Sequence, residues 1–182
     1  MKRITDAPMD VAADGGKADP HAFRSAMRQL AGGISAITVG HGHGEDRTGL
    51  TVTSVASLSA DPPAVVFCIN QSASSWPVLK RRRSFAVNVL TPAQIALAER
   101  FSGRGGAKGS ARYEGALWTT LVTGTPVLAD ALAALDCEVE DIVERFGSAV
   151  IIGRVVAVSV RAEDAEPEAL TYWRGMYGIL RT

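Results

Sequence analysis

Short apolar segments of strand length dominate the chain after residue 33. Seven of them lie at 34–39, 50–55, 64–69, 85–90, 117–122, 137–143 and 150–160, with Gly and Pro between them. Their content of Val and Ile is typical of strands. Helices do not alternate with these segments in a regular βαβ rhythm, so a parallel sheet is not expected. The pattern therefore predicts a mainly β chain with an antiparallel, closed or nearly closed sheet, because closure removes exposed strand edges.

One helix is expected before the first strand. Residues 20–31 follow Asp19, a suitable N-cap, and begin with Pro20, which is favoured in the first turn of a helix. Apolar residues recur there at helical spacing and share one face: Phe23, Met27 and Leu30. This periodicity predicts a helix that packs its apolar face on the core.

Two further helices are expected between strands. Residues 75–83 form one candidate, and residues 92–101 form the other, which begins with a capping-box spacing of Thr91 and Gln94. Residues 130–135 are rich in Ala and Leu, so a short turn of helix is an alternative interpretation of this segment. The expected fold is thus a sheet with a few packing helices.

Composition sets limits on the class of protein. The 182 residues suit one domain, and 19 basic side chains balance 19 acidic ones, so no overall field favours nucleic acid or an anionic membrane. The first nineteen residues lack the apolar run of a signal peptide, and no segment is long and apolar enough to span a bilayer. We expect a flexible tail at 1–19, one domain at 20–182 and a cytoplasmic location.

Residues that commonly carry enzyme chemistry are few. His41 and His43 lie in the glycine-rich run 40–44, where no third metal ligand can be named, so a hairpin loop is expected there. Cys68 and Cys137 lie in apolar strand patterns and are expected to be buried and structural. The run "SGRGGAKGS" at 102–110 lacks the spacing of a phosphate loop and predicts a flexible surface loop. Any chemistry must then be carried by a cofactor.

Short hydroxyl side chains are concentrated in the stretch "GLTVTSVASLSADPP" at 49–63. They are Thr51, Thr53, Ser54, Ser57 and Ser59. A dry core would leave several of these groups without hydrogen-bond partners. Some of them should therefore face solvent or a polar ligand.

A second polar stretch, "NQSASSWPVLKRRR" at 70–83, precedes and enters the second helix. Ser72, Ser74 and Ser75 lie just before the helix start, where free backbone N–H groups favour an anion. The four cations at 80–83 would add to this attraction. The alternative is a simple N-cap followed by a solvated basic face.

Several blocks of the sequence resemble one known family. They include "FRSAMRQLAGGISAITV", the two polar stretches above, "SFAVNVLTPAQIALAERFSG", "ALDCEVEDI", "IIGRVVAV" and "LTYWRGMYGIL". From about residue 20 to the C-terminus the chain resembles the flavin reductases that serve two-component monooxygenases, notably those of 4-hydroxyphenylacetate 3-monooxygenase. The resemblance implies an FMN-binding split β-barrel of Greek-key-like topology, usually a homodimer. It also implies that NADH or NADPH reduces FMN, or FAD, which then diffuses to a partner flavin-dependent monooxygenase.

The resemblance assigns residues of this chain to the cofactor. By resemblance, contacts with the ribityl chain, the phosphate and the ring are expected from Thr51, Val52, Thr53 and Ser54. Backbone groups that meet the edge of the isoalloxazine are expected from Ser57 and Leu58. The wall of the site continues with Cys68, Ile69 and Asn70. The phosphate segment matches Ser72, Ser74 and Ser75, and the dimethylbenzene end matches Phe101. A C-terminal segment near the cofactor or a dimer partner matches Tyr172, Trp173, Arg174 and Tyr177.

One departure from the family concerns catalysis. Many relatives read Gly-Asp-His-Thr where this chain has "FGSA" at 146–149, so Ser148 stands in place of the His. A serine can form hydrogen bonds but cannot carry an imidazolium charge. Ser148 and Ser57 are candidates for tuning the flavin or ordering the nicotinamide. A non-enzymatic flavin-binding protein, a flavin-dependent reductase of a corrinoid or ferric chelate, and an all-β interaction module without a ligand remain open.

Overall fold

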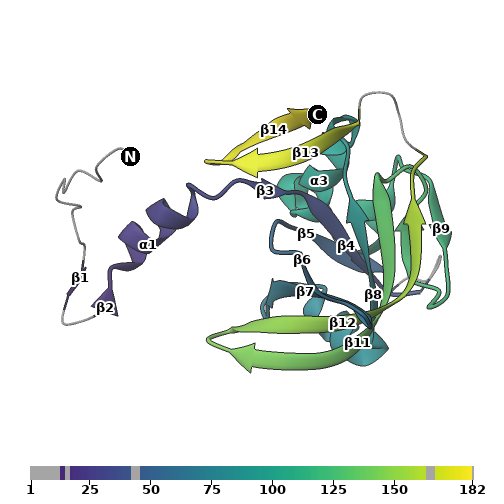
Figure 1. Ribbon diagram of the computed structural model, residues 1–182, viewed down its shortest axis with the longest axis horizontal. Coiled ribbons are helices and arrows are strands. Elements are labelled where there is room, and N and C mark those ends of the chain that lie inside the picture. Colours follow the sequence, from purple (N-terminus) through teal and green to yellow (C-terminus); the bar gives the residue numbers. More distant parts are fainter. Residues whose placement is uncertain (1–12, 15–16, 42–45, 163–166, 182) are drawn as a thin grey trace.

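A seven-stranded antiparallel sheet forms the body of the protein (Figure 1). The computed structural model describes residues 13–14, 17–41, 46–162 and 167–181. Along the sheet the strands are β5 (Thr48–Val52), β4 (Ser35–Val39), β8 (Ser84–Val89), β11 (Ala133–Arg145), β12 (Ser148–Val160), β7 (Pro63–Asn70) and β6 (Ala56–Ala60). The predicted antiparallel, mainly β class is confirmed.

The sheet is curled, because consecutive strands lie at its two edges. β5 and β6 are the outermost strands, yet only residues 53–55 separate them in the chain. A flat seven-stranded sheet would place its edges about 29 Å apart. Three linking residues span at most about 14 Å. The edges therefore approach each other, but within the described residues β5 and β6 do not pair, so the barrel is split rather than closed.

The stretch 49–63 is divided between two strands, and the strand predicted at 50–55 ends at Val52 instead. β5 ends at Val52 and pairs with β4, whereas β6 begins at Ala56 and pairs with β7. The chain between them leaves one edge of the sheet and joins the other. The hydroxyl-rich segment thus spans the split.

Two apolar clusters hold the sheet and its covering elements together. The first lies inside the curl and contains the fully buried Ile37, Phe67 and Phe85. Phe67 and Phe85 meet edge to face with their ring centroids 5.0 Å apart. The second cluster packs α3 (Ile95–Phe101) against the sheet and includes Phe101 and Leu170. These clusters fix the position of the strand edges.

A small sheet formed by β3 (Gly32–Gly33), β13 (Glu168–Trp173) and β14 (Met176–Arg181) lies beside the body. We call β13 and β14 the C-terminal ribbon. Leu170 is buried and marks its inner face, which Tyr172 and Tyr177 share because the register pairs these tyrosines. The opposite face carries the pair Trp173 and Met176, both exposed. The two faces of the ribbon therefore have different environments.

The helices between strands follow the expected positions. α2 (Trp76–Arg82) occupies the first candidate region. The second contains a 3-10 turn, η1 (Pro92–Gln94), followed by α3, and the predicted capping box is confirmed because Thr91 N donates to Gln94 Oε1 at 2.9 Å. Two more 3-10 turns, η2 (Arg104–Gly106) and η3 (Gly109–Tyr113), follow α3.

The first helix forms, but its expected packing is wrong. α1 (Pro20–Met27) has Asp19 as its N-cap, whose carboxylate accepts a hydrogen bond from Ala22 N at 2.7 Å. None of the residues of α1, all of which the structure describes, is buried. Phe23 is 57 % and Met27 48 % exposed, and α1 extends away from the sheets (Figure 1). Its apolar face is therefore not buried against the core.

The possible helical turn at 130–135 is absent from the structure. Ala133 begins β11 instead, and Ala134 and Leu135 pair with β8 on one side and β12 on the other. Pairing in the centre of a sheet outweighs a modest helix propensity. The remaining strands are the pair β9 (Trp118–Thr120) and β10 (Pro126–Leu128), and the pair β1 (Ala13–Asp14) and β2 (Lys17–Ala18). Most of the predicted tail, residues 1–12 and 15–16, lies outside the described residues.

Candidate functional site

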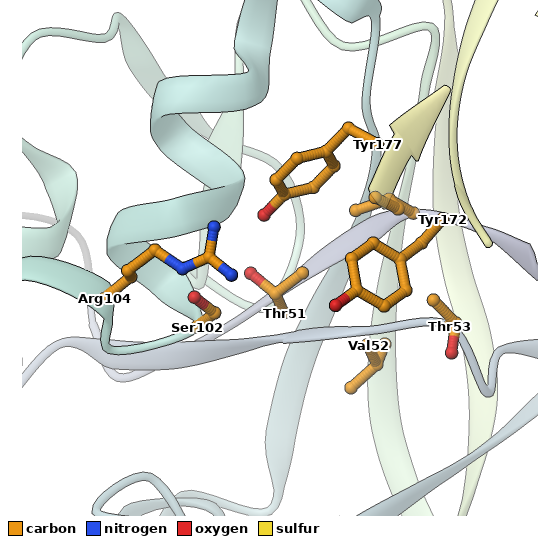
Figure 2. A pocket seen from close by; sticks show the side chains of 8 residues that line it. Thr51, Val52, Thr53, Ser102, Arg104, Tyr172 and Tyr177 are labelled. Carbon is orange, nitrogen blue, oxygen red and sulfur yellow. The ribbon is translucent and has the colours of Figure 1, made fainter. Parts of the chain in front are cut away.

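A pocket of about 230 Å³ opens beside the split in the barrel (Figure 2). Its walls come from β5, from the segment after α3 and from the inner face of the C-terminal ribbon. The lining residues are Ile34, Thr51, Val52, Thr53, Ser102, Arg104, Tyr172 and Tyr177. The structure thus brings together four of the predicted cofactor residues, Thr51, Val52, Thr53 and Tyr172, with Tyr177 of the predicted C-terminal segment.

The wall formed by β5 and the residue after it is polar at Thr51 and Thr53 and apolar at Val52 between them. Val52 points its side chain into the core and is 8 % exposed, as alternation along a strand requires. Thr51 is half-buried, and its hydroxyl donates a hydrogen bond to the carbonyl of Ala98 in α3 at 2.6 Å. A hydroxyl has one hydrogen, so Thr51 Oγ1 retains only acceptor capacity toward a ligand.

The ribbon wall consists of two tyrosine rings. Tyr172 and Tyr177 pack edge to face with centroids 5.5 Å apart and an interplanar angle of 67°. Burial raises the pKa of Tyr177 above its ordinary value, so its hydroxyl stays protonated at neutral pH. The rings supply an apolar surface bordered by two hydroxyl groups.

The third wall carries a positive charge. Arg104 lies between Gly103 and Gly105, whose φ angles of 84° and 76° suit glycine. Its guanidinium donates a hydrogen bond to Glu99 Oε1 at 2.7 Å, and this carboxylate raises the pKa of Arg104. In Figure 2 the guanidinium points toward Tyr177 and Thr51. An arginine has five N–H donors, so Arg104 can bind Glu99 and an anion together.

Sequence reasoning did not find Ile34, Ser102 or Arg104. The run 102–110 was interpreted as a surface loop, and Ser102 and Arg104 are indeed exposed. The sequence offered only a single arginine between two glycines after a helix. Such an arginine does not predict a ligand site unless the fold is known to place it opposite β5.

A second polar row continues from the pocket along the end of β7. Ser54 lies shortly before the first residue of β6. Its Oγ accepts a hydrogen bond from Cys68 N of β7 at 3.1 Å, which continues the contact between these two parts of the chain. Asn70 Oδ1 accepts from both the backbone N and the hydroxyl of Ser72, each at 2.8 Å. Ser148, at the start of β12, pairs directly with Asn70. We call Ser54, Cys68, Asn70, Ser72 and Ser148 the polar row; its members are exposed.

The cations of the second helix are engaged elsewhere. Lys80 forms an ion pair with Glu144 at 2.9 Å, and Arg81 and Arg82 both pair with Asp46. The Arg83 guanidinium donates to the carbonyl of Val139. This arrangement favours the alternative of a solvated basic face over a group of cations directed at a phosphate.

The serines before α2 have different environments. Ser74 is exposed, whereas Ser75 is fully buried, and its hydroxyl has no hydrogen-bond partner among the described residues. Ser75 occupies the N-cap position without a side-chain capping bond. Their predicted contact with a phosphate stays a prediction.

The remaining predicted residues lie outside the described pocket lining. Ile69 and Phe101 are in the core, 2 % and 1 % exposed. Ser57 and Leu58 are exposed on the edge strand β6. Arg174 lies in the turn of the ribbon, with its guanidinium 5.4 Å from the ring centroid of Trp173. Their predicted roles also stay predictions.

The two cysteines differ, which corrects one expectation. Cys137 is buried, and burial raises the pKa of its thiol to about 12. Cys68 is exposed, because its side chain points outward from β7 while its neighbours Phe67 and Ile69 point into the core. The apolar strand pattern did not reveal which face Cys68 occupies.

Neither a metal-binding cluster nor a membrane-spanning helix is present among the described residues. No cluster of three or more His, Cys, Asp or Glu side chains is placed to hold a metal ion in that part of the chain. His43 of the glycine-rich run lies outside the described residues. Within the same residues, every helix is too short or too polar to cross a membrane.

Comparisons with known proteins give consistent matches. The family model of the flavin reductase like domain matches residues 27–181. An FMN reductase (NADH), RutF 2, of Methylorubrum extorquens strain PA1 is 39 % identical over 159 residues, which cover 87 % of this chain and 88 % of that protein. HsaB of Mycobacterium tuberculosis, the reductase subunit of a flavin-dependent monooxygenase, is 33 % identical over 159 residues, which cover 87 % of this chain and 81 % of HsaB.

A solved structure shows the same fold. The crystal structure of a flavin reductase domain protein from Arthrobacter sp. FB24 superposes with a TM-score of 0.76 at 32 % identity. The match covers 88 % of this chain and 94 % of that one.

Proposed function

This chain belongs to the flavin reductase like domain family, and we propose on that basis that it binds a flavin in the pocket of Figure 2 and reduces it with a nicotinamide nucleotide. The observation that carries the proposal is the meeting of the hydroxyl-rich β5, two tyrosine rings and Arg104 around one pocket. Each of these groups suits a different part of a flavin nucleotide.

The chemical character of the pocket fits such a ligand. Tyr172 and Tyr177 offer an aromatic surface for a flat ring system. Thr51, Thr53 and Ser102 carry hydroxyls that suit a polyhydroxylated chain, and Arg104 suits a phosphate.

The size of the pocket limits what it holds. About 230 Å³ is below the roughly 300–1,000 Å³ of typical small-molecule sites. We therefore expect one part of the flavin inside the pocket and the rest along the polar row. Ser54 and Asn70, with the exposed Ser72, would then border the bound molecule, as the family resemblance implies.

The residues of the chain bind and orient rather than exchange protons. Thr51 can only accept a hydrogen bond from the ligand, since its hydrogen is donated to Ala98 O. Tyr177 stays protonated, because burial raises its pKa. A nicotinamide and a flavin bound here would supply the hydride donor and the hydride acceptor. Holding two ring systems in contact is then the main task of the protein.

Finer assignments are supported by the relatives and by the earlier resemblance. The name of the M. extorquens relative supports FMN and NADH, with FAD possible, and the name of HsaB supports a partner flavin-dependent monooxygenase that receives reduced flavin. We also propose a homodimer, one domain at 20–182 and a cytoplasmic location. Ser57 and Ser148 remain proposed contacts that tune the flavin or order the nicotinamide.

Three measurements test the proposal. Titration of FMN against the purified protein should give saturable binding, and the complex should oxidise NADH, followed by its absorbance. Binding without NADH oxidation would favour a non-enzymatic flavin-binding protein. Absence of binding would refute the proposal, and an unchanged melting temperature in saturating FMN would support that outcome, since ligand at 100 times Kd stabilises by about 2.7 kcal/mol.

A further inference from the structure

The hairpin of β11 and β12 ends in a two-residue turn that presents an aromatic ring to solvent. Arg145 pairs with Ser148, so Phe146 and Gly147 form the turn at the end of this long hairpin (Figure 1). Both turn residues have positive φ angles, 53° and 75°, which identify a type I′ turn. The side chain of Phe146 is fully exposed, so it adds nothing to the core.

Phenylalanine is poorly suited to this position. The first central residue of a type I′ turn is usually Asn, Asp or Gly, because these residues tolerate a left-handed backbone. A bulky side chain in that conformation lowers the stability of the fold, and the exposed ring gains no burial in return. A residue that costs stability and packs against nothing in the described part of the chain points to a contact with another molecule.

Neighbouring residues hold the turn in place. Gln71 N donates a hydrogen bond to the carbonyl of Gly147 at 3.0 Å, and Gln71 Nε2 donates to Glu144 Oε2 at 2.6 Å. The other carboxylate oxygen of Glu144 forms an ion pair with Lys80 of α2 at 2.9 Å. The end of the hairpin is thus tied to α2 and to the segment before it, and it presents the ring from a fixed position.

The ring lies at one end of the polar row. Ser148 pairs with Asn70, and both residues belong to that row. Phe146 precedes Ser148 by two residues, so their Cα atoms are at most about 7 Å apart. The part of the flavin outside the pocket is expected along the polar row, and Ser148 is a proposed contact of the nicotinamide. A nicotinamide nucleotide bound there would pass within reach of Phe146.

A cation next to the ring has no acidic partner among the described residues. Arg145 Nη1 donates to the carbonyl of Glu144 at 2.7 Å, and the carboxylate of Glu144 is engaged by Gln71 and Lys80. A guanidinium has five N–H donors, so the others remain for an anion. An aromatic ring beside an arginine suits a nucleotide, because the ring stacks on the base and the arginine binds phosphate.

The nucleotide of the proposed reaction carries an adenosine diphosphate half for which the pocket provides no contact. The sequence also lacks the G-x-G-x-x-G fingerprint with which a dinucleotide-binding fold holds a pyrophosphate. Residues near the flavin must therefore hold this half of NADH or NADPH. We propose that Phe146 stacks on the adenine ring of the nicotinamide nucleotide and that Arg145 binds its phosphates. This assignment rests on the proposed function and adds an adenosine subsite to it.

Steady-state kinetics of NADH oxidation at saturating FMN test the stacking contact. F146N should raise the KM for NADH about 5- to 100-fold, the range expected for loss of one stack between a base and an aromatic ring. The kcat and the Kd for FMN should stay near those of the wild type. Because Asn suits a type I′ turn, F146N should melt no lower than the wild type.

Two variants serve as controls for this change. F146W keeps an aromatic ring, so its KM for NADH should stay close to that of the wild type. L117N removes another exposed apolar side chain, which lies outside both the pocket of Figure 2 and the polar row, and it should leave the KM unchanged.

Direct binding separates this inference from the proposed function. ADP-ribose carries the adenine and the diphosphate but no nicotinamide, so its calorimetric titration does not depend on flavin reduction. F146N should weaken ADP-ribose binding about 5- to 100-fold. Arg145→Gln should weaken the binding of ADP-ribose more than that of adenosine, which has no phosphate.

The outcomes of these experiments are distinct. Binding of ADP-ribose that depends on Phe146, in a protein that leaves NADH unoxidised, would support the adenosine contact and refute the proposed function. Absence of ADP-ribose binding to the wild type, or an F146N variant with unchanged KM for NADH and unchanged affinity for ADP-ribose, would overturn the inference. A changed sedimenting mass of F146N without a change in either value would assign the ring to a contact between proteins and would also overturn it.

Discussion

Replacement of Thr51 by Val separates the two roles that the pocket geometry gives this residue. Valine has nearly the same shape, so the change removes a hydroxyl without creating a large cavity. The wild-type hydroxyl donates to the carbonyl of Ala98 at 2.6 Å, which ties β5 to α3. It also faces the pocket, where it can accept a hydrogen bond from a ligand.

Each role has an expected magnitude. Loss of one partly buried hydrogen bond should lower the free energy of unfolding by about 1 kcal/mol, which corresponds to a fall in Tm of roughly 2–4 °C for a chain of this size. A ligand donor left without its acceptor should weaken FMN binding by about 0.5–1.5 kcal/mol, or roughly 2- to 10-fold in Kd. Because Thr51 is not expected to act in hydride transfer, turnover of NADH at saturating FMN should change little.

Thermal unfolding and a fluorescence titration with FMN measure the two effects on the same sample. Thr120→Val is a matched control, since Thr120 is exposed on β9 and lies outside the pocket lining. It should leave both values near those of the wild type. A Thr51→Val protein that loses stability but binds FMN with unchanged Kd would show that Thr51 is only a structural tie, and would refute the reasoning.

Four further predictions concern charge, thiol reactivity, the pH dependence of stability and packing. Arg104→Gln should weaken binding of FMN more than that of riboflavin, which lacks the phosphate; equal weakening in the two titrations would exclude a phosphate contact. A thiol reagent at pH 8 should modify Cys68 in the native protein and both cysteines after denaturation, because burial raises the pKa of Cys137 to about 12; two reactive thiols in the native state would contradict this. Between about pH 9 and 12 the thiol of Cys137 ionises only in the unfolded chain, so its contribution to stability should fall as pH rises. Gly153→Ala should lower the free energy of unfolding by about 1–3 kcal/mol, since an added Cβ would lie 2.3 Å from a buried ring, whereas Gly33→Ala meets open space and should show a much smaller loss in a melting experiment.

The strands were predictable because their signal is local. Apolar β-branched runs located β4, β7, β8, β11 and β12, and the antiparallel class followed from the missing βαβ rhythm. Alternation along 49–63 also indicated extended backbone. It could not show that the two halves of this segment pair with different strands, since periodicity carries no information about partners.

The sequence predicted where the helices form, but it did not predict what the apolar face of α1 contacts. Periodicity and the Asp19 cap located α1, but amphipathicity shows only that one face is apolar, not which molecule covers it. At 130–135 the Ala and Leu residues suggested helix, whereas Ala134 and Leu135 lie between two paired strands. Pairing with the strands on both sides determined the conformation of that segment.

The candidate site was predictable in part for the same reason. The density of hydroxyls singled out Thr51 and Thr53, and both line the pocket. Arg104 and Ser102 lie about fifty residues later, in a loop without a recognisable spacing, and reach the pocket because α3 packs beside β5, to which the Thr51 bond also joins it. Contacts of this kind depend on the fold and leave no local pattern.

A crystal structure of the protein with FMN tests the central claim most directly. The account predicts the ligand between β5, Arg104 and the rings of Tyr172 and Tyr177, with the remainder along Ser54 and Asn70. Flavin bound away from these walls, or crystals that stay free of FMN at saturating concentration, would contradict it.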